Sequence, residues 1–209
     1  TVVATHLNRL LQKQVHELLG HEEAQQMIDR LARHAPRLAE ALVPDTVSMS
    51  VLLRVLKGLL AEQVPVRDLR TIAESIVANV AFNQDPGRMI EAVRVSLARA
   101  IVQEIYGNLD NLPVITLAMS MEQLLLKSMA QQASGELSLE PGLAEQLQSA
   151  LAQAVQSQEM GGKPAVLLVT AALRPVLARL ARYGGHNLSV LSYNEIPDDK
   201  QITIEHSVG

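Results

Sequence analysis

The sequence predicts a mainly α-helical chain that ends in a small α/β region, and three observations lead to this fold class. Apolar residues make up 48% of the 209 residues but aromatic residues only 2%, so the core must consist of Leu, Val, Ile, Ala and Met. Leu, Ala and Met, which are not branched at Cβ, lose little side-chain freedom in a helix. Up to about residue 108 the apolar residues recur at helical spacing, and beyond it short β-branched runs alternate with helical stretches.

The first half predicts amphipathic helices joined by short loops, which implies a compact helical bundle or superhelix. Thr5 is a candidate N-cap of the first helix, whose apolar stripe ends at Gly20. Ser48 or Ser50 can cap a later helix, and Asp85-Pro86 places a cap before a proline at the first helical position. The helices are expected at about residues 5–19, 22–33, 51–60, 67–80 and 86–105, with breaks at Pro36, Pro44 and Pro65.

The second half predicts a small α/β region with a mixed sheet. The run at residues 165–169 is apolar at every position, as expected for a strand that is covered on both faces. Residues 201–206 alternate apolar and polar side chains, which is typical of an edge strand. Further strands are expected at 113–117 and 188–192, and helices at 119–131, 141–158 and 175–182. We place the boundary between a helical domain, residues 21–108, and the α/β domain, residues 109–209, near residues 107–112.

Composition and charge argue against several classes of protein. The formal net charge is −4 and the 18 Lys and Arg residues are scattered, so there is no basic footprint for a nucleic acid. The scarcity of aromatic rings disfavours binding that depends on stacking, such as that of single strands. The absence of cysteine excludes disulfides and thiolate metal sites. No apolar run approaches the roughly 18 residues that a membrane helix needs.

Two short patterns resemble catalytic motifs but fail on spacing. His16 and His21 are five residues apart, whereas the zinc-protease motif places its two histidines four apart on one helix face. Gly161-Gly162-Lys163 resembles the end of a phosphate-binding loop, yet it lacks the earlier glycine and is followed by Pro164 instead of Ser or Thr. We therefore expect surface histidines, a simple loop, no catalytic or metal site and no cofactor.

Two other features each allow two interpretations. The residues Arg67, Asp68, Arg70 and Glu74 give one short helix a dense mixed charge. They are either a solvated face with weak ion pairs or a subunit interface in which charge sets the register. The opening helix carries a broad apolar stripe, and the chain begins with Thr1 rather than Met. We interpret the chain as a fragment, so this stripe either lacks its natural partner or is buried within the helical domain.

Several segments, in the same order along nearly the whole chain, resemble the cytosolic region of the FlhA family of export-gate membrane proteins, which flagellar and virulence type III secretion share. The opening TVVATHLN and the segment LEPGL favour the flagellar branch, whereas LSYNEI also fits the virulence branch. The matching segments are residues 1–8, 42–44, 56–72, 85–86, 92–95, 97–101, 139–143, 164–180 and 191–196.

The resemblance implies an N-terminal membrane half and a cytosolic half of four subdomains, on the cytoplasmic face of the bacterial inner membrane. Residues 1–20 would be the last helix of the first subdomain, followed by the helical third and the α/β fourth. Family members form a nine-membered ring, largely through the helical subdomain. The ring receives export substrates, their chaperones and the ATPase complex, and other export-gate components are further partners. By alignment, Thr5 would contribute to the cleft that docks chaperones.

The sequence therefore predicts a ring-forming, non-enzymatic module of the flagellar export gate, with Arg67, Asp68, Arg70 and Glu74 at or beside the subunit interface. One alternative is the homologous virulence export gate. Another, from a different class, is a small α/β nucleotide-binding enzyme with a helical accessory domain. In isolation we expect the chain to be a monomer or to associate weakly, because the high local concentration in the membrane is lost.

Overall fold

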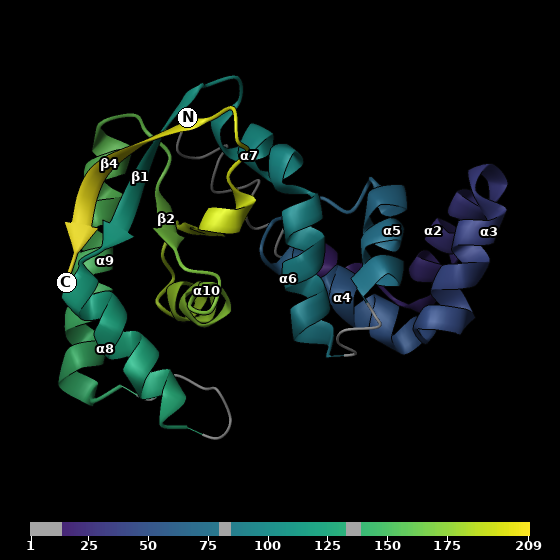
Figure 1. Ribbon diagram of the computed structural model, residues 1–209, viewed down its shortest axis with the longest axis horizontal. Coiled ribbons are helices and arrows are strands. Elements are labelled where there is room, and N and C mark those ends of the chain that lie inside the picture. Colours follow the sequence, from purple (N-terminus) through teal and green to yellow (C-terminus); the bar gives the residue numbers. More distant parts are fainter. Residues whose placement is uncertain (1–13, 80–84, 133–138) are drawn as a thin grey trace. The chain divides into compact units, whose positions relative to one another are not determined.

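The computed structural model describes residues 14–79, 85–132 and 139–209, and it divides the chain into two compact units (Figure 1). The first unit extends to Ile101 and the second begins at Val102. The first consists of helices, and the second contains a four-stranded sheet with helices. The predicted fold class, a helical region followed by a small α/β region, is confirmed.

The helical unit packs its apolar stripes around one core. Helix α6 packs against α4 and α5, and α2 packs against α4 and α5. Leu56 of α4, Ile72 of α5 and Val93 of α6 are completely buried, as their helical spacing predicted. The elements are α2 (His21–His34), α3 (Pro36–Glu40), the kinked segment η1 (Ala41–Thr46) with extended backbone at Val43, α4 (Met49–Ala61), α5 (Leu69–Asn79) and α6 (Pro86–Ser96).

Side-chain caps begin two of these helices where the sequence predicted them. The Ser48 hydroxyl accepts a hydrogen bond from the Val51 N–H at 3.2 Å, so Ser48 rather than Ser50 is the N-cap of α4. The Asp85 carboxylate accepts one from the Arg88 N–H at 3.2 Å, and Pro86 is the first residue of α6. Such a cap satisfies a backbone donor that has no partner within the helix.

The single helix predicted for residues 86–105 is wrong, because the chain forms α6 and a separate helix α7 (Ala98–Tyr106). Leu97 lies between them with φ −95° and ψ 11°, and its N–H donates to the carbonyls of both Val93 and Arg94. Its side chain is buried. The apolar stripe continues across the break, so helical spacing alone could not reveal it.

The α/β unit has a sheet of strand order β3-β2-β1-β4 in which every neighbouring pair is parallel. The predicted mixed sheet is therefore wrong in strand direction. Helical crossovers from β1 to β2 and from β2 to β3 return the chain to the same end of the sheet, as parallel pairing requires. The elements are β1 (Asn111–Leu117), α8 (Met119–Ala130), α9 (Pro141–Met160), β2 (Val166–Val169), α10 (Arg174–Tyr183), β3 (Ser189–Ser192), the 3₁₀ turn η2 (Tyr193–Glu195) and β4 (Gln201–Val208).

Helices α8, α9 and α10 share one apolar core with a face of the sheet. Ile115 of β1, Leu167 of β2 and Val208 of β4 lie in this core together with Leu147 and Leu151 of α9. The strand β4 lies along β1 at the outer edge of the sheet, as predicted for the alternating segment, and is drawn in yellow in Figure 1.

Tyr106, in the last turn of α7, is tied to β1 by a buried hydrogen bond. Its hydroxyl donates to the Pro113 carbonyl at 2.8 Å. Burial raises the pKa of the Tyr106 hydroxyl well above its ordinary value, so the group stays protonated and keeps its role as donor. Pro113 has no backbone N–H to donate to a neighbouring strand, but its carbonyl is available to Tyr106. The bond therefore fixes the end of α7 to this part of β1.

Candidate functional site

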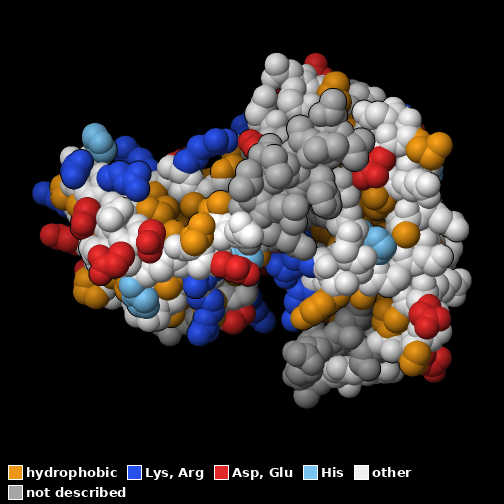
Figure 2. Space-filling model, turned by 180° about the vertical axis from the view of Figure 1, so that it is seen from behind, with side chains coloured by type: hydrophobic (Ala, Val, Ile, Leu, Met, Phe, Trp, Pro, Cys, Tyr) orange, Lys and Arg blue, Asp and Glu red, His pale blue; other side chains and the backbone are white. Residues whose placement is uncertain are grey.

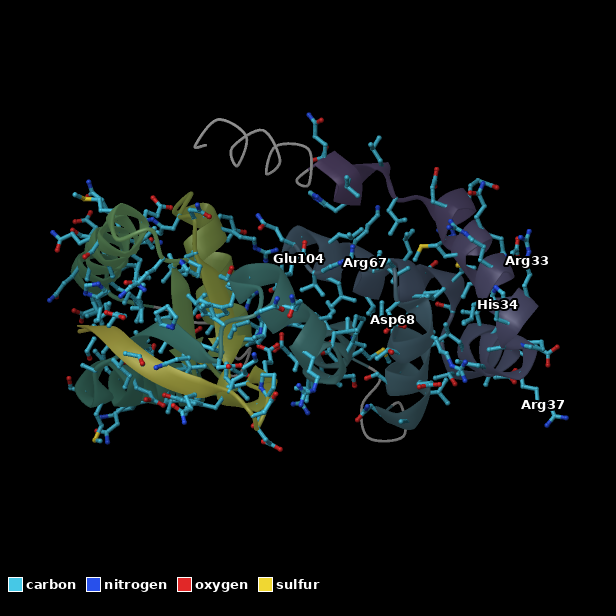
Figure 3. The ribbon with its side chains drawn as sticks, turned by 90° about the horizontal axis from the view of Figure 1, so that it is seen from above. Arg33, His34, Arg37, Arg67, Asp68 and Glu104 are labelled. Carbon is cyan, nitrogen blue, oxygen red and sulfur yellow. The ribbon has the colours of Figure 1, made fainter. Side chains whose placement is uncertain are left out.

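The four charged residues predicted as an interface all lie exposed on α5 or directly before it, and we call this set the α5 charged face (Arg67, Asp68, Arg70 and Glu74). The opposite side of α5 is buried. Figure 3 shows Arg67 and Asp68 together at the start of this helix. The α5 charged face is thus an outer surface of the helical unit, and no charge in it belongs to the core.

Asp68 has a local role within this face. Its carboxylate accepts hydrogen bonds from the Thr71 N–H at 3.1 Å and from the Thr71 hydroxyl at 2.6 Å. This is the geometry of an N-cap, which the sequence interpretation did not assign to Asp68. The cap fixes the start of α5 and so determines where the neighbouring arginines lie.

Arg70 and Glu74 form an ion pair one helical turn apart, with Nε and Oε1 separated by 3.2 Å. Both side chains are largely exposed, and such a pair contributes only about 0.3–0.5 kcal/mol to a helix. So weak a pair leaves both side chains available to rearrange against another surface. The arrangement fits both earlier interpretations, a solvated face and an interface.

Replacing Asp68 with Ala is expected to lower the free energy of unfolding by about 1 kcal/mol, because the first turn of α5 loses its cap. Asp68→Asn should retain most of the stability, since the amide oxygen can still accept from the Thr71 N–H. Urea denaturation followed by circular dichroism measures both variants. A loss of stability in Asp68→Asn as large as in Asp68→Ala would show that the negative charge, and not the cap, stabilises the helix.

Thr5, the residue that the family resemblance placed in a chaperone cleft, lies outside the described residues. Of the opening helix, residues 14–18 are described. Within this part Leu18 is 74% exposed and Val15 is also exposed. These two side chains of the stripe are therefore not buried within the helical unit.

A basic cluster that sequence reasoning missed lies at the junction of α2 and α3, and we call it the α2–α3 basic cluster (Arg33, His34 and Arg37). All three side chains are exposed. Figure 3 shows Arg33 and His34 near each other and Arg37 farther away, with all three at the end of the helical unit away from Arg67 and Asp68. In Figure 2 side chains of both charge signs cover this unit. The signal in the sequence was three basic residues within five positions around Pro36.

The residues of the two short patterns that resemble catalytic motifs do not come together in a site. His21 is the first residue of α2, whereas His16 lies in the preceding helical segment. Lys163 forms an ion pair with Glu205 at 2.7 Å, and Gly162 adopts φ +69° in the turn after α9. In residues 14–79, 85–132 and 139–209 no three His, Asp or Glu side chains are grouped so that they could hold a metal ion. Over the same described ranges, none of the helices combines the length and apolarity needed to cross a membrane.

Comparison with known proteins identifies a family. The model of the FHIPEP family matches residues 1–201. The flagellar biosynthesis protein FlhA of Escherichia coli is 44% identical over 209 residues, which is all of this chain and 30% of that protein. The chain therefore spans less than a third of this curated relative.

Solved structures give the same result for the fold. The CdsV protein of Chlamydia pneumoniae aligns with a TM-score of 0.89 and 25% identity over all of this chain and 60% of its own. CdsV in complex with CdsO aligns with a TM-score of 0.88 and 26% identity, again over all of this chain and 61% of its own. The nonameric SctV-C of EPEC, at 23% identity and a TM-score of 0.81 over 99% of this chain and 62% of its own, shares the fold. The chain thus belongs to the FHIPEP family and is a relative of the flagellar protein FlhA.

Proposed function

We propose that this chain is the cytosolic part of a type III protein export gate, which assembles into a ring and docks export partners at the cytoplasmic face of the bacterial inner membrane. The observation that carries the proposal is the match to FlhA of Escherichia coli at 44% identity along the entire chain. The identity to a flagellar relative favours the flagellar branch over the virulence branch. The proposal assigns assembly and docking to the chain, and no catalysis.

The helical unit is the part that we propose for ring formation. A ring joins two different surfaces of neighbouring copies, because a contact between identical surfaces stops at a dimer. The α5 charged face and the α2–α3 basic cluster are two separate exposed surfaces of this unit (Figure 3). The α5 charged face carries both signs of charge, so charge can set which surface of the neighbouring copy it contacts and in which register.

Docking of other proteins is the second part of the proposal. The related CdsV has been solved in complex with CdsO, so one relative binds a partner through a chain that includes this fold. We extend this to the export ATPase complex, to chaperone–substrate complexes and to other export-gate components. Thr5 is the proposed chaperone contact, within a cleft that the upstream part of the longer protein would complete.

Reversal of charge on the α5 charged face tests the ring. The double variant Arg67→Glu/Arg70→Glu, in the full-length membrane protein, is expected to reduce the fraction of nonamer severalfold, because it turns a face of two positive and two negative charges into one of four negative charges and removes any pair that the two arginines make with acidic side chains of the neighbouring copy. Arg33→Glu/Arg37→Glu tests the α2–α3 basic cluster separately, and a loss of nonamer in this variant would place the cluster in a subunit contact as well. Native mass spectrometry or electron microscopy of the detergent-solubilised protein measures the fraction.

The matched control is Arg179→Glu/Arg182→Glu, which makes the same change of charge on the exposed side of α10 in the α/β unit. It should assemble like the wild type. Normal assembly of the Arg67→Glu/Arg70→Glu variant would remove the α5 charged face from the interface. Equal loss in the control would instead point to an effect of net charge.

A further inference from the structure

No strand of the described residues pairs with the outer edge of β4, and the composition of this edge is unusual for an edge strand. Among the described residues β4 pairs with β1 alone, through the register Asn111↔Gln201 to Leu117↔Val208. All four residues of its first half, Gln201 to Ile204, are exposed. Ile204 is 62% exposed and Ile202 38%. Natural edge strands usually carry a charge or a proline that prevents pairing with another chain, and this stretch has neither.

A β-bulge places the two isoleucines on the face of the sheet opposite to that of Val208. Val114 aligns with Ile204, but the next residue of β1, Ile115, aligns with His206, so Glu205 is an extra residue in β4. Side chains of β4 change faces at this point. Val208 enters the core below α8 and α9, whereas Ile202 and Ile204 lie on the other face, at its rim.

The charged side chains that flank the exposed stretch pair with other groups of the α/β unit. The Glu205 carboxylate pairs with Lys163 at 2.7 Å. On the other side, the Lys200 ammonium donates to the Leu109 carbonyl at 2.8 Å and lies 3.3 Å from the Asp110 carboxylate. Neither charge opposes the approach of a second strand with the same sequence, because each is matched within its own chain.

We propose that β4 is a self-association site, at which two copies of the chain pair their β4 edges antiparallel about Thr203. A second copy is favoured over another partner because the stretch is complementary to itself. With Thr203 opposite Thr203 of the second copy, each Ile202 lies opposite an Ile204 on the same face. Two cross-strand pairs of β-branched apolar side chains form, and no like charges meet. Backbone donors and acceptors along the edge are satisfied at the same time.

This site is separate from the ring contact proposed above. It lies in the α/β unit and joins two copies by a two-fold contact, whereas ring formation was assigned to the helical unit. The two proposals can therefore fail independently. The weak self-association that we expect for the isolated chain would occur at this site.

Analytical ultracentrifugation of the chain over a range of concentrations provides the first test. The weight-average mass should rise toward that of a dimer with increasing concentration. Ile204→Lys should weaken association about tenfold or more, because it removes both apolar cross-strand pairs and places charge on the edge. The matched control is Tyr183→Lys, which changes an exposed apolar side chain at the end of α10 and should leave association unchanged. Circular dichroism should show that both variants are folded.

Disulfide trapping tests the register, and the chain is suited to it because it contains no cysteine. In the proposed pairing Thr203→Cys meets its own counterpart at a Cα separation of about 5 Å, within reach of a disulfide. Mild oxidation should therefore give a covalent dimer. Ile202→Cys should not cross-link to itself, because its counterpart lies about 8 Å away. A mixture of Ile202→Cys and Ile204→Cys should yield the heterodimer.

Three results would overturn the proposal: a chain that remains monomeric at millimolar concentration, equal weakening by Tyr183→Lys, or oxidation of Ile202→Cys as efficient as that of Thr203→Cys. A monomeric chain would mean that the edge of β4 does not bind a second copy. The second would move the contact to another surface. The third would indicate parallel pairing or random collision.

Discussion

Replacing Glu62 with Leu is expected to lower the free energy of unfolding by about 3 kcal/mol or more. Glu62 follows the last residue of α4, and its carboxylate lies 2.9 Å from the guanidinium of Arg94 in α6. The Arg94 side chain is only 3% exposed and that of Glu62 13%. Replacing Glu62 takes this carboxylate away from a buried guanidinium, and the desolvation of that charge is then compensated less well, at a large cost in free energy. Urea denaturation of the whole chain, with helical content followed by circular dichroism, measures this loss in the free energy of unfolding.

The double variant Glu62→Leu/Arg94→Met separates this cost from the worth of the pair. Because both charges are gone, its loss of stability should be smaller than the sum of the two single losses, and smaller than that of Glu62→Leu alone. If the double variant loses the full sum, the two residues do not interact energetically. The exposed pair Arg70–Glu74 supplies the contrast, since Glu74→Leu should change stability by no more than about 0.5 kcal/mol.

Replacing Leu151 with Ala is expected to lower the free energy of unfolding of the α/β unit by about 2–5 kcal/mol. Leu151 is fully buried in α9, in the core that α8, α9 and α10 share with the sheet. The smaller side chain removes apolar contact and leaves a cavity that the surrounding strands can fill only in part. Amide hydrogen exchange of β1 and β2 measures the free energy of unfolding of this unit, and denaturant unfolding of the whole chain provides a second measurement.

Met160→Ala is the matched control, because Met160 is the last residue of the same helix and its side chain is exposed. It should change stability by less than about 0.5 kcal/mol. Hydrogen exchange in the helical unit should be unaffected by Leu151→Ala if the two compact units unfold separately. A loss below about 1 kcal/mol in Leu151→Ala would mean that the core around α9 is loosely packed.

Much of the local structure could be predicted because its signals lie within a few residues of each other. The apolar spacing of α4 and the caps Ser48 and Asp85 act through contacts of three or four positions. The apolar run at β2 and the alternating run at β4 likewise identified strands and their central or edge position. The candidate site was predicted less completely, because the α5 charged face is seen in sequence only as a group of charges. Whether it is solvated or covered depends on a second surface.

Other features required the tertiary structure. The break at Leu97 interrupts no apolar periodicity, because its side chain is buried like those on either side of it. The role of Asp68 as a cap also emerged only when the start of α5 was located, since a charge in a loop and a charge at a helix start look alike in sequence.

The sequence by itself determined where most helices and strands lie, that the caps of α4 and α6 come directly before them, and to which family the chain is similar, because each of these depends on local periodicity or on ordered segments. The tertiary structure decided strand direction, the separation of the α2–α3 basic cluster from the α5 charged face, and the bulge at Glu205 that places Ile202 and Ile204 on the face opposite to that of Val208. The alternation in residues 201–208 would place both isoleucines and Val208 on one face. Only pairing with β1, in a register set by contacts nearly a hundred residues away, divides them between two faces, and no local signal encodes that register.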